Sequence, residues 1–232
     1  MPRLVQCRGV ILRLLRVALL TAVVGFVTSA ARAQDPPPRI GPFVLDVHGT
    51  VPRFPSDDQQ LADSRALLLR ELPGAGLGLH TSAYLYPLRW KAVTFGIGGD
   101  LTLARSSKAA PQIAQGVVGR AVTETFSHIA PEISFNFGDG DGWSYISGGI
   151  GPGVWSLVPE GSVDSPADTE RLQTINYGGG ARWFIKPHLA FSFDVRFYAI
   201  NPGTPVLGRP GGPRKTLVFM GAGISVKYRP DV

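Results

Sequence analysis

The residues whose types could do chemistry at close spacing are His80 and Ser82, separated by one threonine. Residues two apart in an extended strand lie on the same face, which would make the imidazole and the hydroxyl neighbours. Glu132 is a candidate acid to orient the imidazole, completing the three groups that activate a serine nucleophile. A His-x-Ser pair also arises easily by chance, and it suits a buried, hydrogen-bonded histidine equally well. We therefore expect no enzymatic activity.

Other kinds of site have less support in the sequence. His48, His80 and His128 fall on separate predicted strands with no cysteine beside them, so no metal site is expected. The glycine-rich run 148–153 lacks the following helix that a dinucleotide site needs. The sequence thus predicts no cofactor.

The elements that must position these residues are β-strands. In the segment 189–199 every second residue is apolar and most of the intervening residues are polar. This period of two is typical of a strand with one apolar and one polar face. Seven other segments alternate in the same way, although glycine obscures the pattern in the fifth. The eight predicted strands cover about 43–50, 77–86, 93–103, 127–137, 143–157, 174–185, 189–199 and 217–228.

The connections between the predicted strands alternate in length. Short turns rich in Gly, Pro and Asp occupy 87–91, 138–142 and 186–188. Long connections span 51–73, 104–122, 158–171 and 201–214. All long loops therefore lie at one end of the strands, and both termini lie at the short-turn end. This pattern favours an all-β, eight-stranded antiparallel up-and-down transmembrane β-barrel over a Greek-key sandwich.

The first long loop is predicted to contain a short helix. Ser56-Asp-Asp-Gln59 is a candidate capping box, and the following 61–72 contains neither glycine nor proline. We expect the helix from about Asp57 to Leu69, where it would cover the barrel mouth. The alternative is an element that contacts a partner or lipid.

Periodicity alone leaves open which face of each strand points inward. In a lipid-embedded barrel the apolar face points outward and the interior is polar. The inward face then carries nearly balanced charges, as buried ions require, and its glycines leave room for two arginines to cross the lumen. Eight strands enclose a lumen that side chains fill, so an open pore is not expected. The predicted lumen ionic network is Asp46, Asp100, Glu132, Arg182, Asp194, Arg196 and Lys227.

Aromatic residues at the strand ends support a lipid-embedded barrel. Trp90, Trp143, Trp183 and Tyr228 adjoin the short turns, where an interfacial aromatic girdle is expected. Trp155 is expected toward the opposite rim.

The beginning of the chain is typical of a secretory signal peptide. Four arginines precede an uncharged apolar run, 17–30, which is followed by the cleavage signal Ala31-Arg-Ala33. The apolar run is shorter than a membrane-spanning helix requires, and no second run reaches that length. We expect a signal peptide at 1–33, a Pro-rich leader at 34–39 and one β-barrel domain at 40–232.

Removal of 1–33 changes the charge of the chain. Five arginines and no acid leave with it, so Lys and Arg fall from 23 to 18 against 17 Asp and Glu. A net charge of +1 gives no support to nucleic acid as a partner. Cys7, the only cysteine, leaves as well, so disulfides are not expected.

A signal peptide, eight alternating strands, long loops at one end and an ionic lumen together resemble the small outer-membrane β-barrel proteins of Gram-negative bacteria, the OmpA/OmpX-like superfamily. The resemblance covers about 40–228 and is one of pattern, without a diagnostic motif. It implies a location in the cell outer membrane, contact with outer-membrane lipid and insertion by the barrel-assembly machinery. Members usually end on an aromatic residue that this machinery reads, whereas here Tyr228 precedes four further residues.

The expected function is therefore a non-enzymatic, monomeric outer-membrane barrel with a structural or surface-interaction role and an unidentified loop partner. One alternative is a lipid A-modifying enzyme, since His-x-Ser resembles the pair in lipid A deacylase barrels. There the pair should face lipid, whereas the predicted register turns His80 and Ser82 toward the lumen. The other alternative is a soluble lipocalin-like calyx for an apolar ligand, with Phe191, Phe193 and Phe197 inside.

Overall fold

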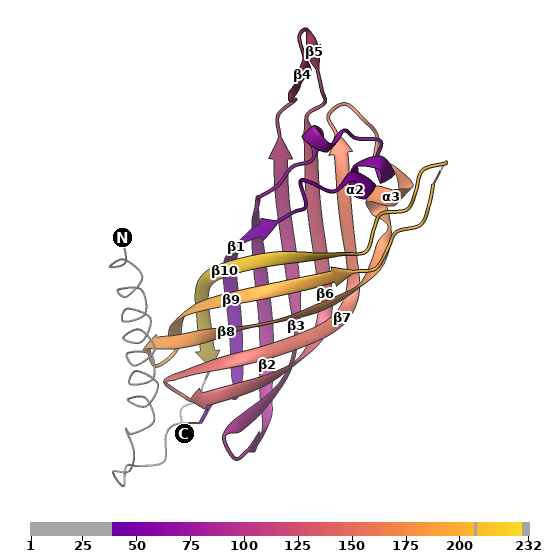
Figure 1. Ribbon diagram of the computed structural model, residues 1–232. Coiled ribbons are helices and arrows are strands. Elements are labelled where there is room, and N and C mark those ends of the chain that lie inside the picture. Colours follow the sequence, from indigo (N-terminus) through magenta and orange to yellow (C-terminus); the bar gives the residue numbers. More distant parts are fainter. Residues whose placement is uncertain (1–38, 207, 229–232) are drawn as a thin grey trace, which may run out of the picture. The chain divides into compact units, whose positions relative to one another are not determined.

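The computed structural model describes residues 39–206 and 208–228, so the expected signal peptide and nearly all of the leader lie outside the described residues. Eight long strands are present: β1 (Phe43–Arg53), β2 (Leu77–Trp90), β3 (Val93–Lys108), β6 (Val122–Asp139), β7 (Gly142–Pro159), β8 (Arg171–Lys186), β9 (Leu189–Ile200) and β10 (Lys215–Tyr228). They form one closed antiparallel barrel in the order β1-β10-β9-β8-β7-β6-β3-β2 (Figure 1). The predicted eight-stranded up-and-down barrel is confirmed.

The connections alternate as predicted, but the strands are longer than the sequence pattern indicated. Only two residues separate the strands at each short turn, and the long connections span 54–76, 109–121, 160–170 and 201–214. We call these four connections the loop crown. It holds the helices α2 (Gln59–Ser64) and α3 (Pro166–Thr169) at one end of the barrel (Figure 1). It also holds an unpredicted hairpin of β4 (Gln112–Ala114) and β5 (Val117–Val118).

The apolar faces of the strands point outward. Ile133 is 57% exposed and Phe191 48% exposed, whereas the inward Asp194 is only 2% exposed. An apolar outer surface and a polar interior are the arrangement of a barrel that sits in lipid. The calyx alternative is wrong, because it required the phenylalanines inside and the charges in water. In the part of the chain that the structure describes, no helix has the length and hydropathy to cross a membrane.

The helix of the first long loop is shorter than predicted. The side chain of Asp58, not of Ser56, caps α2 by accepting a hydrogen bond from the Leu61 amide at 3.0 Å. The helix ends at Ser64, and the backbone then turns through Ala66, which has a φ of +50°. A 3-10 turn at Leu69–Glu71 follows. A turn in place of a longer helix lets apolar side chains on both sides of Ala66 point into the barrel mouth.

Two apolar clusters close the barrel interior. At the loop end, side chains of the first long loop pack on inward residues of β6, β7, β9 and β10, as a covering element should. The members of this cluster include Phe54, Leu61, Leu67, Leu72, Phe126, Trp155, Leu157, Tyr198, Leu217 and Phe219. At the short-turn end the second cluster is Ile40, Val44, Trp143 and Tyr145, with Tyr86 and Phe184 packed against it.

The cluster at the short-turn end corrects the prediction for one tryptophan. Trp143 is 3% exposed and lies in the short-turn cluster, not in a girdle. Trp155 lies in the loop-end cluster, toward the opposite rim as predicted, and its side chain is buried there. Both occupy inward positions of β7, and the lumen there has room for a ring. Trp90, Trp183 and Tyr228 are exposed near the short turns, as a girdle requires.

Candidate functional site

The polar middle of the lumen contains a buried ion pair that crosses the barrel. Asp46 lies on β1 and Arg182 on β8, two strands that are not neighbours in the sheet. Arg182 Nε donates to Asp46 Oδ1 at 2.8 Å, and Nη2 donates to Oδ2 at 2.5 Å. Ser82 and Ser225 donate to the same carboxylate. The guanidinium also lies 3.9 Å from the centre of the Tyr145 ring, so both charges are paired and their remaining surface is covered.

A second ionic group is organised by Arg196 on β9. Its Nη1 donates to Glu132 Oε1 at 2.5 Å, and its Nε donates to Asp194 Oδ1 at 3.1 Å. Tyr145 donates to Asp194 at 2.6 Å, and Tyr84 donates to Glu132. One arginine therefore serves two carboxylates, and two phenols supply further donors to them.

Asp100 on β3 joins this group through an amide. Asn176 Nδ2 donates to Asp100 Oδ1 at 3.0 Å and to Glu132 Oε1 at 2.5 Å. The nearest basic groups to Asp100 are imidazoles: His80 Nε2 lies 3.9 Å and His128 Nε2 lies 3.8 Å from its oxygens. The amide of Asn176 thus links two acids of which only Glu132 forms a direct ion pair with an arginine.

Lys227 lies near the short-turn end of the lumen, one residue before the end of β10. Its ammonium donates to the backbone carbonyl of Gly140 and lies 4.1 Å from the centre of the Phe184 ring. All seven residues of the predicted lumen ionic network are buried. The structure brings six of them into the two ionic groups and places Lys227 at the rim of the turns.

The large lumen side chains depend on inward glycines. A Cβ added to Gly178 would lie 3.0 Å from Arg196 Cδ and 2.2 Å from the Val195 carbonyl oxygen. A Cβ at Gly180 would lie 2.9 Å from the Tyr145 hydroxyl. The glycines of β8 therefore leave the space that the side chains of Arg196 and Tyr145 occupy.

The serine and histidine of the candidate catalytic pair do not meet. Both face the lumen, but Ser82 donates to Asp46 at 3.0 Å, while His80 Nδ1 lies 3.4 Å from His48 Nδ1. A different pair does form, since His48 Nε2 lies 2.7 Å from Ser192 Oγ. His48 and Ser192 are both fully buried, so neither presents an atom to a substrate.

Four buried groups of the lumen were not singled out from the sequence: Tyr84, Tyr145, Asn176 and Ser225. Each carries a neutral donor that hydrogen-bonds a carboxylate. The alternation in the sequence already places these four residues on the inward faces of their strands. They were missed because only charged residues were selected for the predicted network. Among residues 39–206 and 208–228 no group of three or more His, Cys, Asp or Glu is arranged to hold a metal ion.

The loop crown is tied to its first loop by ion pairs. Asp58 pairs with Lys215 at the start of β10, and Glu71 Oε2 lies 3.1 Å from Arg120 Nη2. Arg65 Nη1 lies 3.6 Å from Asp168 Oδ1 of α3. The first loop is thus tied to the second loop, to the third loop and to β10, the strand that follows the fourth loop.

Two of these acids have pKa values below the usual range of a carboxyl group. Burial alone would raise the pKa of Glu71, but hydrogen bonds from Arg120 and the Leu68 amide outweigh it and lower that pKa. Burial would likewise raise the pKa of Asp58, while hydrogen bonds from Lys215 and the Leu61 amide lower it. Both carboxylates are therefore ionised and paired at neutral pH.

No protein-family model matches the sequence, and no curated protein matches it. Solved structures do match. The attachment invasion locus protein Ail of Yersinia pestis is 10% identical, with a TM-score of 0.47 over 80% of this chain and 97% of that one. The outer membrane protein OprG of Pseudomonas aeruginosa is 9% identical, with a TM-score of 0.46 over 84% of this chain and 100% of that one.

Neisserial surface protein A gives a TM-score of 0.51 at 14% identity. The match covers 81% of this chain and 98% of the neisserial protein. At this identity the similarity concerns the fold, and it agrees with the closed barrel described above. The chain has the fold of the small eight-stranded outer-membrane β-barrels.

Proposed function

We propose that the protein is an integral, monomeric barrel of the Gram-negative outer membrane that acts through its surface loops, without catalytic or channel activity. The observation that carries this proposal is the filled interior. The two ionic groups occupy the middle of the lumen, and an apolar cluster lies at each end of it. Solutes have no continuous polar path through such an interior.

The sheet supports a monomer that sits among outer-membrane lipids. β1 and β10 pair along eleven consecutive positions and close the barrel, so the eight long strands leave no free edge to a second copy. The outward isoleucines and phenylalanines contact the acyl chains. Tyr228 ends β10 with an exposed ring, and we propose that the barrel-assembly machinery reads it there.

The loop crown supports the surface role. Its ion pairs and its apolar cluster give the first long loop a fixed conformation against the barrel. A fixed surface loses little conformational entropy when a partner binds, which favours recognition. The catalytic alternative lacks an assembled site, since His80 and Ser82 have separate partners.

Two measurements on one preparation test this proposal. The full chain is expressed in a Gram-negative host, purified from outer membranes in detergent, and run on SDS gels with and without boiling. We expect a heat-modifiable band and, in planar bilayers, no stepwise conductance. A folded, monodisperse protein in the absence of detergent would contradict the membrane location, and stable current steps would contradict the filled lumen.

A further inference from the structure

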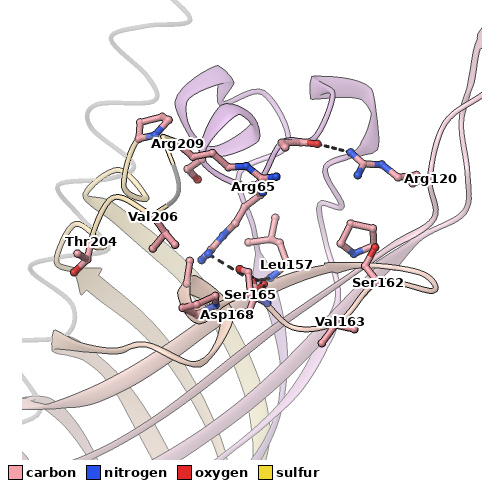
Figure 2. Close-up of a pocket in the computed structure, with 16 residues that line it drawn as sticks. Arg65, Arg120, Leu157, Ser162, Val163, Ser165, Asp168, Thr204, Val206 and Arg209 are labelled. Atoms are coloured by element: carbon pink, nitrogen blue, oxygen red, sulfur yellow. Dashed lines mark hydrogen bonds and ion pairs between the residues drawn. The ribbon is translucent and has the colours of Figure 1, made fainter.

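A pocket of about 360 Å³ lies within the loop crown, remote from the lumen ionic network (Figure 2). All four long connections contribute to its wall, which includes Arg65, Arg120, Asp168, Thr204 and Arg209. Its volume is within the range of pockets that bind small molecules. Three of these side chains are arginines and one is a carboxylate.

Arg65 is the buried arginine of the pocket, with only 6% of its side chain exposed. Its Nη2 donates to the Trp155 carbonyl at 3.0 Å, and in Figure 2 the side chain reaches toward Asp168. The 3.6 Å separation from Asp168 is an ion pair but too long for a hydrogen bond. Within the described chain, Nε and Nη1 of Arg65 have no acceptor. Buried donors of this kind call for an acceptor supplied from outside the protein.

The other two arginines approach the pocket from different loops. Arg120 pairs with Glu71 and also donates to the Ala66 carbonyl, which fixes its guanidinium at one side (Figure 2). Arg209 comes from the fourth long connection and lies on the other side of Arg65 in this view. Its guanidinium has no hydrogen bond or ion pair with any residue that the structure describes.

The carboxylates around the pocket already have donors. Asp168 accepts from the Leu157 amide at 2.9 Å and from the amide and hydroxyl of Ser165 at 3.0 and 2.6 Å. Glu170 accepts from the amide and hydroxyl of Thr204. Asp168 and Glu170 are therefore satisfied, while Arg65 Nε and Nη1 and the Arg209 guanidinium have no hydrogen-bond acceptor among the described residues. The buried Glu124, which also attracts Arg65, accepts from Trp155 through one oxygen and has no donor at the other. A ligand that fits this wall must bring acceptors.

We propose that the pocket binds a small oxyanion, a phosphate monoester carried on a group the size of a single sugar. The planar guanidinium matches a phosphate with two parallel hydrogen bonds, which distinguishes it from a neutral hydroxyl. The phosphate would bind the exposed Arg209 guanidinium, and Arg65 would turn its buried Nε and Nη1 from the Asp168 ion pair toward it, with Arg120 adding positive charge from the opposite side. This inference rests on the proposed function, because the loop crown must face the exterior for the ligand to arrive.

Calorimetric titration of the full chain in zwitterionic detergent tests the pocket. Glucose 1-phosphate is the probe, and unphosphorylated glucose is the matched neutral ligand. We expect the phosphate to bind with a saturable isotherm and glucose to give none. Equal binding of both sugars, or binding of neither, would overturn the proposal. Since this measurement needs only folded protein, its failure is separate from a failure of membrane location.

Two arginines of the fourth loop provide the variants. Arg209→Gln should weaken binding about tenfold or more, the loss expected for a charge-assisted hydrogen bond of about 1.4 kcal/mol. Arg214→Gln removes an exposed arginine of the same loop that does not line the pocket, and it should leave affinity within about twofold. Both positions are accessible, so neither variant threatens the fold. Equal effects of the two substitutions would show that the phosphate is attracted non-specifically to positive charge, and would refute specific binding in the pocket.

The phosphate has two sources that share this chemistry, a soluble phosphorylated sugar and a phosphorylated headgroup of the surrounding lipid. Nanodiscs of phosphatidylcholine with and without phosphatidic acid separate them. Unchanged affinity for glucose 1-phosphate in both discs would support a soluble ligand. Competition by phosphatidic acid, lost in Arg209→Gln, would support the same pocket filled by a headgroup.

Discussion

Asp46 and Arg182 exchange two hydrogen bonds of 2.8 and 2.5 Å in the centre of the barrel, although 136 positions separate them along the chain. Both side chains have no exposed surface. The pair joins two strands that do not touch in the sheet, so it holds opposite walls of the barrel together.

Substitution of one partner should therefore be far more harmful than substitution of both. We expect Arg182→Met to destabilise the barrel by about 3–5 kcal/mol, because it leaves the Asp46 charge buried and unpaired. The double variant Asp46→Leu/Arg182→Met should recover most of that loss. Urea unfolding in lipid vesicles measures both, with Arg171→Met, an exposed position of the same strand, as the control. Equal stability of single and double variants would contradict the account.

Asn176 makes a second test of the interior, because its amide serves two acids. Asn176→Asp keeps the shape but replaces the donor with a further carboxyl group beside Asp100 and Glu132. We expect a loss of at least about 2–3 kcal/mol, the cost of removing hydrogen bonds to charged groups. Gln173→Glu adds the same charge at an exposed position of β8 and should be nearly neutral. A similar urea midpoint for both variants would argue against the amide bridge.

Three inward rings form the centre of the loop-end cluster. Phe219 lies 4.9 Å from Tyr198 and 5.6 Å from Phe126, measured between ring centres. Phe219→Ala should cost about 3–5 kcal/mol, because the surrounding strands cannot collapse into the cavity. The neighbouring Met220 faces outward, so Met220→Ala should cost much less in the same urea titration. An equal loss at the two positions would mean that the rings do not form a packed core.

The ion pairs of the first loop predict an acid-induced opening. The pKa values of Asp58 and Glu71 are lowered in the folded protein. These ion pairs therefore stabilise the loop fully at a pH above the unfolded-state pKa values of about 4, and the stabilisation is lost as the pH falls through the folded-state pKa values. We expect hydrogen exchange in 54–76, corrected for intrinsic rates, to rise below about pH 4 while the strands stay protected. Loop protection that persists at pH 3 would contradict this.

Glu71→Gln should reproduce the opening at neutral pH. It removes the charge that Arg120 pairs with, and we expect the loop to lose about 1–3 kcal/mol of local stability. Glu160→Gln changes an exposed acid of the third loop and should leave exchange in 54–76 unaltered.

The sequence predicted the membrane-facing part of the fold well. Strict alternation on segments such as 189–199 places one face in lipid and the other in the lumen, and both faces lie as predicted. The same rule assigned all seven charged residues to the interior, because charge on a strand of alternating polarity can only face away from lipid.

The rule fails where the strands extend beyond the apolar belt. At the start of β6 the outward residues are Thr123 and Thr125, whereas Val122 and Phe126 point inward and are buried. Polarity is reversed here, because the outer face meets water and the inner face packs on the first loop. Which inward group serves which partner also depends on contacts across the lumen, such as Asn176 with Asp100, and no local pattern encodes them.

The packing of the first long loop has a consequence for biogenesis. This loop is synthesised early, yet Leu61 and Leu72 pack on side chains from β6, β7, β9 and β10. It can reach its final place only after the last strand has closed on the first. Resistance of 54–76 to protease would therefore report a completed barrel, and a chain stalled before β10 would be recognised by cleavage in this one segment.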